Sequence, residues 1–145
     1  MSNFVFNIAK GTVREKALKG APLKMLILQA ASAEAVLKDL DSVAAVLADA
    51  GTDEADFTNY ARATLVNVTD TVDDTSDSVS VTANDVVFAS AGGATNNTTV
   101  AVVLFDDVDG TDANAIPLVH LDAVFTTDGN QLTIKFANGG FFGAS

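Results

Sequence analysis

The first residues to consider for chemistry are His120, the only histidine of the chain, and Asp122, which follows two positions later. Residues two apart in a strand point to the same face, so Asp122 is placed to orient the imidazole as a general base. The pair lacks a recognisable nucleophile, because the sequence contains neither a cysteine nor a G-x-S-x-G elbow. We therefore predict that the protein is not an enzyme and that His120 is hydrogen-bonded at the surface or at an interface.

A second group of reactive side chains lies in the sequence DDVDGTD around Gly110. Its four carboxylates belong to Asp106, Asp107, Asp109 and Asp112. Oxygen ligands on a tight turn suit calcium, but aligning Gly110 with the glycine of an EF-hand places Phe105 and Ile116 at the first and last ligand positions. A solvated turn is the favoured interpretation, a calcium site is the alternative, and we expect no cofactor.

The first part of the chain predicts two strands and one amphipathic helix. NFVFNI, residues 3–8, places Phe4 and Phe6 on one face, and PLKMLILQA, residues 22–30, is a continuous apolar run. Apolar residues at helical spacing predict a helix over about 33–50, with Ser32 as its N-cap and Gly51 in a left-handed conformation at its end. The following residues, 52–61, fit either a short second helix or an extended segment.

From Thr64 onward, short runs rich in valine and threonine alternate with clusters of Asp, Asn, Ser and Gly. This pattern is typical of antiparallel strands. Asp128 and Gly129 predict a tight hairpin turn between the strands on either side. The expected fold is mainly β, an antiparallel β-sandwich or jelly-roll-like domain, with an N-terminal strand-forming arm over residues 1–24 and a single β-rich domain over residues 25–145.

Charge is unevenly distributed along the 145 residues. Residues 1–38 hold six basic and two acidic residues, a net charge of +4, whereas residues 39–145 hold two basic and seventeen acidic residues, a net charge of −15. Such an acidic body argues against nucleic-acid binding, and no apolar run approaches the roughly 18 residues of a membrane span. The basic segment KGTVREKALKGAPLK, residues 10–24, could rest on an acidic protein surface, but on charge alone a solvated charged hairpin is the favoured interpretation.

Several segments, taken in order, carry a family resemblance. They are FTNYAR at 57–62, VDDTSDSVSV at 72–81, AGGATNN at 91–97, AIPL at 115–118, FTTDG at 125–129 and GGFFGAS at 139–145. This ordered set, which covers most of the chain from about Gly51, resembles a family of small tailed-bacteriophage and prophage virion proteins of the head decoration or capsid cement type. The resemblance implies a structural protein, made in the host cytoplasm, that binds the major capsid protein on the outer surface of the phage head and stabilises it. A tail- or fibre-associated adhesin or structural module is the alternative.

If the chain decorates a capsid, its basic arm is the expected contact, with NFVFNI adding a strand to the edge of a shell protein. The partner-binding residues expected there are Phe4, Phe6, Lys10, Arg14, Lys16 and Lys19.

Phe141 and Phe142 are expected to serve self-association. Adjacent strand residues face opposite ways, so one ring can enter the chain's own core while the other needs a second apolar partner. We expect that partner to be another subunit of a homotrimer, joined through the chain terminus and part of the face that carries His120. The alternative is that both rings are covered within one chain.

Overall fold

The computed structural model describes residues 2–9, 22–137 and 140–144. The predicted arm residues Lys10, Arg14, Lys16 and Lys19 lie outside these ranges. The fold is mainly β, with antiparallel sheets and few helices, as the sequence predicted. Neither α-helix within these ranges is long enough to cross a membrane.

The main sheet is built from the long apolar runs of the sequence. Its strand order is β1 (Phe4–Val5), β9 (Ile116–Asp122), β8 (Ala101–Asp106), β2 (Leu23–Ala30) and β3 (Asp53–Glu54), and β4 (Ala63–Thr64) also pairs with β2. All six residues of β8 are buried, as are most of those of β2. Such strands are apolar on both faces, and both faces of this sheet are accordingly covered.

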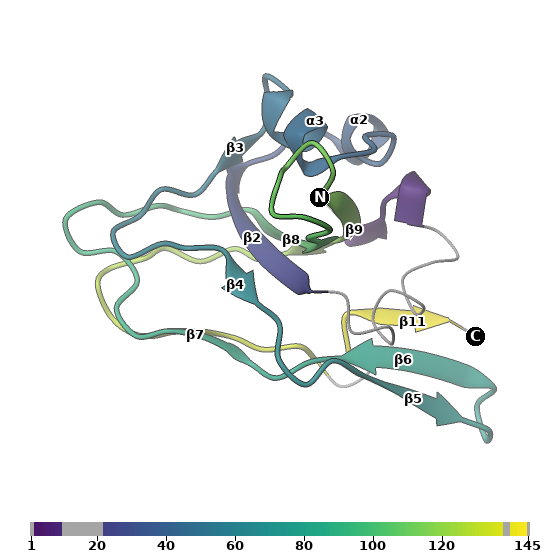
Figure 1. Ribbon diagram of the computed structural model, residues 1–145. Helices are drawn as coiled ribbons and strands as arrows, with labels where there is room; N and C mark the ends of the chain where they lie inside the picture. The colour runs from purple at the N-terminus through teal and green to yellow at the C-terminus, as the bar shows by residue number, and fades with distance from the viewer. Residues whose placement is uncertain (1, 10–21, 138–139, 145) are drawn as a thin grey trace.

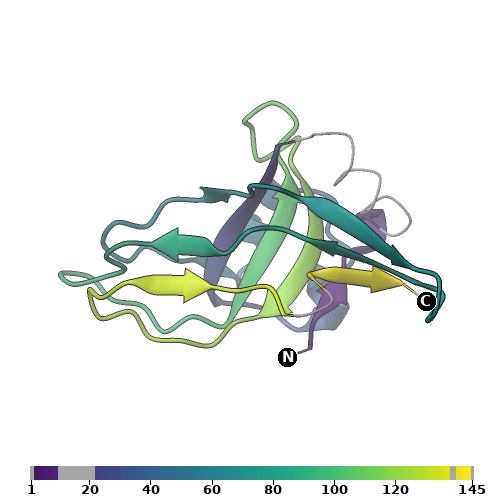
Figure 2. The same ribbon diagram turned by 90° about the horizontal axis from the view of Figure 1, so that it is seen from below.

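Smaller sheets cross one face of the main sheet, as Figure 2 shows. One contains β11 (Phe142–Ala144), β6 (Ser78–Thr82) and β5 (Thr69–Asp73), and the other pairs β10 (Leu132–Ile134) with β7 (Val86–Phe88). The helices lie on the opposite side of the main sheet (Figure 1). The fold is therefore a sandwich of strands with a helical layer outside it.

The predicted helix over 33–50 is divided in two in the structure, into α2 (Glu34–Leu37) and α3 (Val43–Ala48). The division follows from Ser42, which is extended and accepts a hydrogen bond from the Ala45 N–H, so that it caps a new helix instead of continuing the first. A short 3-10 turn, η1 (Asn7–Ala9), follows β1.

Ser32 and Gly51 do not have the capping roles that were predicted. Ala33 occupies the N-cap position of α2, and the Ser32 hydroxyl instead donates to Asp49. Gly51 is not left-handed. A larger residue would clash at this position, because a Cβ on Gly51 would lie 2.2 Å from Ser32 Oγ.

The turn at Asp128 and Gly129 is present, but the predicted hairpin is not. Gly129 has the positive φ, 92°, that such a turn needs. The strands on either side pair elsewhere, β9 with β8 and β1, and β10 with β7. The Gly129 N–H donates to the Ala91 carbonyl, so this turn fastens one loop to another. Residues 52–61 contain strand β3 and no helix.

Candidate functional site

The N-terminal phenylalanines belong to the core of the chain. Phe6 is fully buried and Phe4 is 9% exposed. β1 pairs with β9, placing Phe4 opposite His120, and the Phe6 N–H donates to the Leu118 carbonyl at 3.0 Å. The expectation that Phe4 and Phe6 contact a partner is therefore corrected, because these rings pack against the chain's own sheet. Burying one such ring contributes about 1.5–3 kcal/mol.

His120 is fully buried, which corrects the prediction of a hydrogen-bonded surface or interface histidine. Its ring stacks on Phe4, with 4.5 Å between centroids and 11° between planes. Among the described residues neither ring nitrogen has a hydrogen-bond partner, and Asp122 Oδ1 is 3.9 Å from Nδ1. Burial lowers the pKa of His120, and the negative charge of Asp122 offsets only part of this effect. A general base in this position has no access to a substrate.

The acidic turn does not gather its carboxylates around one point. Asp107 forms an ion pair with Lys24, at 2.6 Å from Nζ, and accepts a hydrogen bond from the Gly110 N–H. Asp109 accepts hydrogen bonds from Thr111 and Asn114, which hold its pKa below the ordinary value. Over residues 2–9, 22–137 and 140–144, no group of three or more candidate ligands could hold a metal ion. Asp106 and Asp107 are only 2% and 9% exposed, which corrects the expectation of a solvated turn.

A charged cluster around Arg62 was not identified from the sequence. The guanidinium makes paired hydrogen bonds to Glu54 and to Asp112, and it lies 5.6 Å from the centre of the Phe105 ring. Arg62 holds the pKa of Asp112 below its ordinary value. Tyr60 completes the cluster: its hydroxyl donates to Glu54 and accepts from the Ile27 N–H.

Burial and the neighbouring Glu54 raise the pKa of Tyr60. The polar side-chain groups of Arg62, Glu54, Asp112 and Tyr60 thus form hydrogen bonds within the chain. These bonds link β2, β3 and the acidic turn. The signal that could have found it is the Tyr60–Arg62 pair shortly after Glu54, but Asp112 lies 50 positions from Arg62.

The terminal phenylalanines have unequal surroundings. Phe141 is 5% exposed and packs edge-on against Phe136, with 5.3 Å between ring centroids. Phe142 is half-buried in β11, opposite Val81 of β6. The structure therefore places Phe141 in the core. Phe142 retains exposed surface, and its role in an interface stays a prediction.

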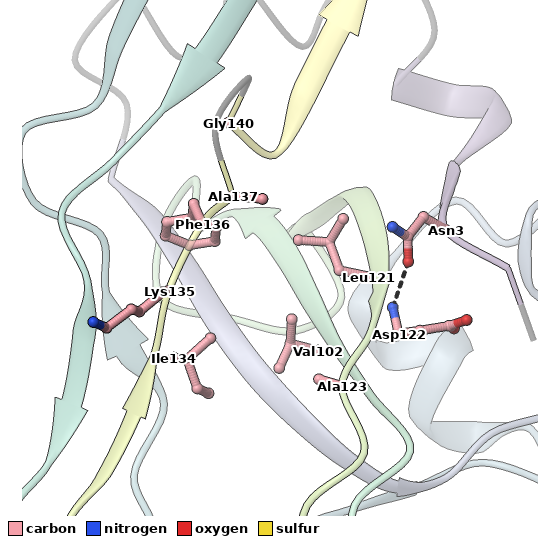
Figure 3. Close-up of a pocket in the computed structure, with 10 residues that line it drawn as sticks. All are labelled: Asn3, Val102, Leu121, Asp122, Ala123, Ile134, Lys135, Phe136, Ala137 and Gly140. Atoms are coloured by element: carbon pink, nitrogen blue, oxygen red, sulfur yellow. Dashed lines mark hydrogen bonds between the residues drawn. The ribbon is translucent and has the colours of Figure 1, made fainter.

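A pocket of about 220 Å³ opens between the β8 and β9 strands and the segment that follows β10 (Figure 3). Its apolar lining includes Val102, Leu121 and Phe136. Figure 3 shows the charged ends of Asp122 and Lys135 directed away from this lining. The pocket therefore suits an apolar group and presents no acid–base pair to a substrate.

A scan of the sequence against protein-family models found no match, and searches of curated proteins and of solved structures found none either.

Proposed function

We propose that the protein is a non-enzymatic structural protein of a tailed bacteriophage, and that it binds the outer surface of the head as a decoration or cement protein. The observation that carries this proposal is the ordered set of sequence segments that resembles head decoration proteins. In the structure, three of those segments contact one another through backbone hydrogen bonds: residues 57–62, 91–97 and 125–129.

These segments are joined by backbone hydrogen bonds at one end of the molecule (Figure 1). The Gly92 N–H donates to Thr58, the Thr58 N–H donates to Thr95, and the Gly129 N–H donates to Ala91. A second glycine, Gly93, approaches Gly129 so closely that a Cβ on Gly129 would lie 3.3 Å from the Gly93 Cα. Glycine suits these two positions because it has no Cβ and readily adopts a positive φ. These three segments therefore hold the loops at this end of the molecule in place against one another.

The charge of the described residues supports a role for the basic arm. Two cations of the body are already paired, Lys24 with Asp107 and Arg62 with Glu54 and Asp112. The other basic residues of the chain are Lys38 and Lys135 and four of the arm, Lys10, Arg14, Lys16 and Lys19, which lie outside the described residues. A basic segment on an acidic body favours docking on an acidic surface of the major capsid protein in one orientation.

A cement protein also binds more tightly when one oligomer contacts several capsid subunits at once. A standard interface buries only about 800 Å² per partner. A homotrimer that grips several capsid subunits adds such contacts through effective concentration, so the trimer binds much more tightly than one chain. Self-association is therefore part of the proposed mechanism.

The test measures binding to purified phage heads that lack the protein. Removing residues 1–20 would also remove Phe4 and Phe6 from the core, so charge neutralisation is the sharper change. We expect the double variant Lys16→Gln/Lys19→Gln to bind heads about tenfold more weakly at moderate salt, the equivalent of roughly 1.4 kcal/mol. The loss should shrink as salt rises.

The matched control is Lys38→Gln/Lys135→Gln, which removes the same charge from outside the arm. It should bind heads as the unchanged protein does. Equal weakening in both variants would contradict a contact through the arm, and unchanged protein that does not bind heads at all would contradict the proposed function.

A further inference from the structure

His120 lies on β9 beside the N-terminal strand β1, on the side of the main sheet that the helices cover. Residues opposite one another in paired strands share a face of the sheet. Phe4 is opposite His120, and His120 is opposite Val103. The imidazole is thus enclosed by the sheet below and by the Phe4 ring, which belongs to the outermost strand.

This enclosure favours a neutral imidazole over a protonated one. A neutral ring already leaves one donor and one acceptor unsatisfied here, because neither nitrogen has a partner among the described residues. Protonation would add a second donor and a positive charge to this buried ring, and the nearest carboxylate oxygen, Asp122 Oδ1, lies 3.9 Å from Nδ1, beyond hydrogen-bond distance. Burying an uncompensated charge is far more costly than burying an unpaired neutral group.

The segment that covers His120 is held by its buried side chains, among them Phe4 and Phe6, and by hydrogen bonds to neighbouring elements. The backbone N–H groups of Phe6 and Asn7 donate to Leu118 and Lys38, and the Asn3 side chain accepts from the Asp122 N–H. Side-chain bonds from Ser2 to Glu34 and from Asn7 to Asp39 add to these. Because β1 is a two-residue edge strand, it can leave without breaking any other strand pair.

We propose that His120 makes the docking of the N-terminal segment, residues 2–9, dependent on pH: the neutral imidazole holds Phe4 against β9, and protonation releases the segment. Release exposes the ring to water and to Asp122, which can then accept a hydrogen bond from it. The inference concerns the chain alone and does not depend on the proposed function.

Three charges act on the imidazole from the elements around it. Asp122 on β9 and Glu34 on α2 favour the protonated ring, whereas the amino-terminal charge disfavours it. Burial is the largest effect, and the pKa of docked His120 lies below its ordinary value. The undocked state therefore binds the proton more readily, and docking weakens as pH falls below about 6.5.

Hydrogen–deuterium exchange of the full chain, corrected for the intrinsic pH dependence of exchange, tests this directly. Between about pH 7.5 and pH 5, the protection of residues 2–9 should fall by up to about 30-fold, the limit set by one proton with an undocked pKa near 6.5. Protection of β2 and β8 should change far less. Constant protection of residues 2–9 over this range would overturn the proposal.

Two variants separate proton binding from simple packing. His120→Phe keeps a stacked ring without a titrating group, so the protection of residues 2–9 should no longer change between these pH values. Asp122→Asn removes a charge that favours protonation, so release should shift to lower pH. A pH dependence unchanged in both variants would show that another group is responsible.

Nuclear magnetic resonance of the unchanged protein provides the measurement if His120→Phe does not fold. Because the chain has one histidine, its ring signal reports His120 alone. The titration midpoint should lie below the ordinary value and coincide with the loss of protection. Titration at the ordinary value with residues 2–9 still protected would reject the mechanism.

Discussion

At the scale of single residues, Arg62 has more polar contacts than any sequence pattern indicated. Replacing it with Ala would remove the paired hydrogen bonds to Glu54 and Asp112 and leave these carboxylates without their cation. Breaking a fully buried pair costs about 3–5 kcal/mol; Arg62 is 26% exposed, so we expect the free energy of unfolding to fall by about 1–3 kcal/mol.

Urea denaturation of Arg62→Ala measures this change. Arg62→Lys serves as the control, because lysine keeps the charge but cannot make the same paired hydrogen bonds. It should lie between Arg62→Ala and the unchanged protein. If both variants unfold at the same urea concentration as the unchanged protein, the cluster does not stabilise the fold.

The residue types that carry chemistry were visible in the sequence, but their surroundings were not. His120 was expected at the surface with a hydrogen bond, yet the structure stacks it on Phe4 from the far end of the chain. The acidic turn was expected to be solvated, and one of its residues, Asp112, instead belongs to the Arg62 cluster. Local spacing reports which side chains share a face, whereas burial depends on strands that are distant in sequence.

At the scale of elements, prediction succeeded where one periodicity dominated. The run that forms β2 was recognised as a strand, since apolar residues occupy most of its positions. The helical stretch was interpreted as one element because its apolar spacing persists across Ser42. The serine cap outweighed that spacing and divided the stretch into α2 and α3.

Gly140 is the residue on which the docking of β11 depends. Its φ is 73°, and a Cβ there would lie 1.9 Å from the Val81 carbonyl oxygen. Gly140→Ala should therefore push β11 away from β6 and lower the free energy of unfolding by about 2–4 kcal/mol, since strain and lost packing add together. Urea denaturation measures the loss, and binding of an apolar dye should report the newly exposed Phe141.

Gly110→Ala is the matched control for this prediction. Gly110 also has a positive φ, 82°, but a Cβ there would meet no atom within 4 Å. The control should therefore lose only the backbone contribution, roughly 1–2 kcal/mol, without increased dye binding. Equal effects from the two substitutions would mean that close approach to Val81 is not what fixes β11.

At the scale of the whole molecule, the sequence predicted the class of fold but not which strands pair. Alternation and turn residues indicated antiparallel strands, and the structure confirms a mainly β architecture. The Asp128–Gly129 turn was interpreted as a hairpin because its own residues fit one. The chain instead passes from the main sheet to the second layer at this point, and β10 pairs with β7. Local sequence cannot report such crossings, because the competing pairings differ only in tertiary packing.

The role of Phe141 and Phe142 depends on the oligomeric state of the protein. In the described part of the chain, β11 is the edge strand of its sheet, and Phe142 on it is half-buried. If the protein is a trimer joined through this edge, Phe142→Ala should remain folded and dissociate. Phe141→Ala should instead lose about 3–4 kcal/mol of stability, as expected for a buried aromatic ring cut to a methyl group.

Light scattering coupled to size-exclusion chromatography, repeated over a dilution series, distinguishes these outcomes. The unchanged protein should keep the mass of three chains until high dilution, and Phe142→Ala should reach the mass of one chain at much higher concentration. Thermal melting then verifies that Phe142→Ala is still folded, because a dissociated but unfolded chain would not identify an interface. If the unchanged protein has the mass of one chain at every concentration, the exposed surface of Phe142 does not join subunits in solution. Two possibilities would then remain: a trimer that assembles only on the capsid surface, or a protein that is not a capsid cement.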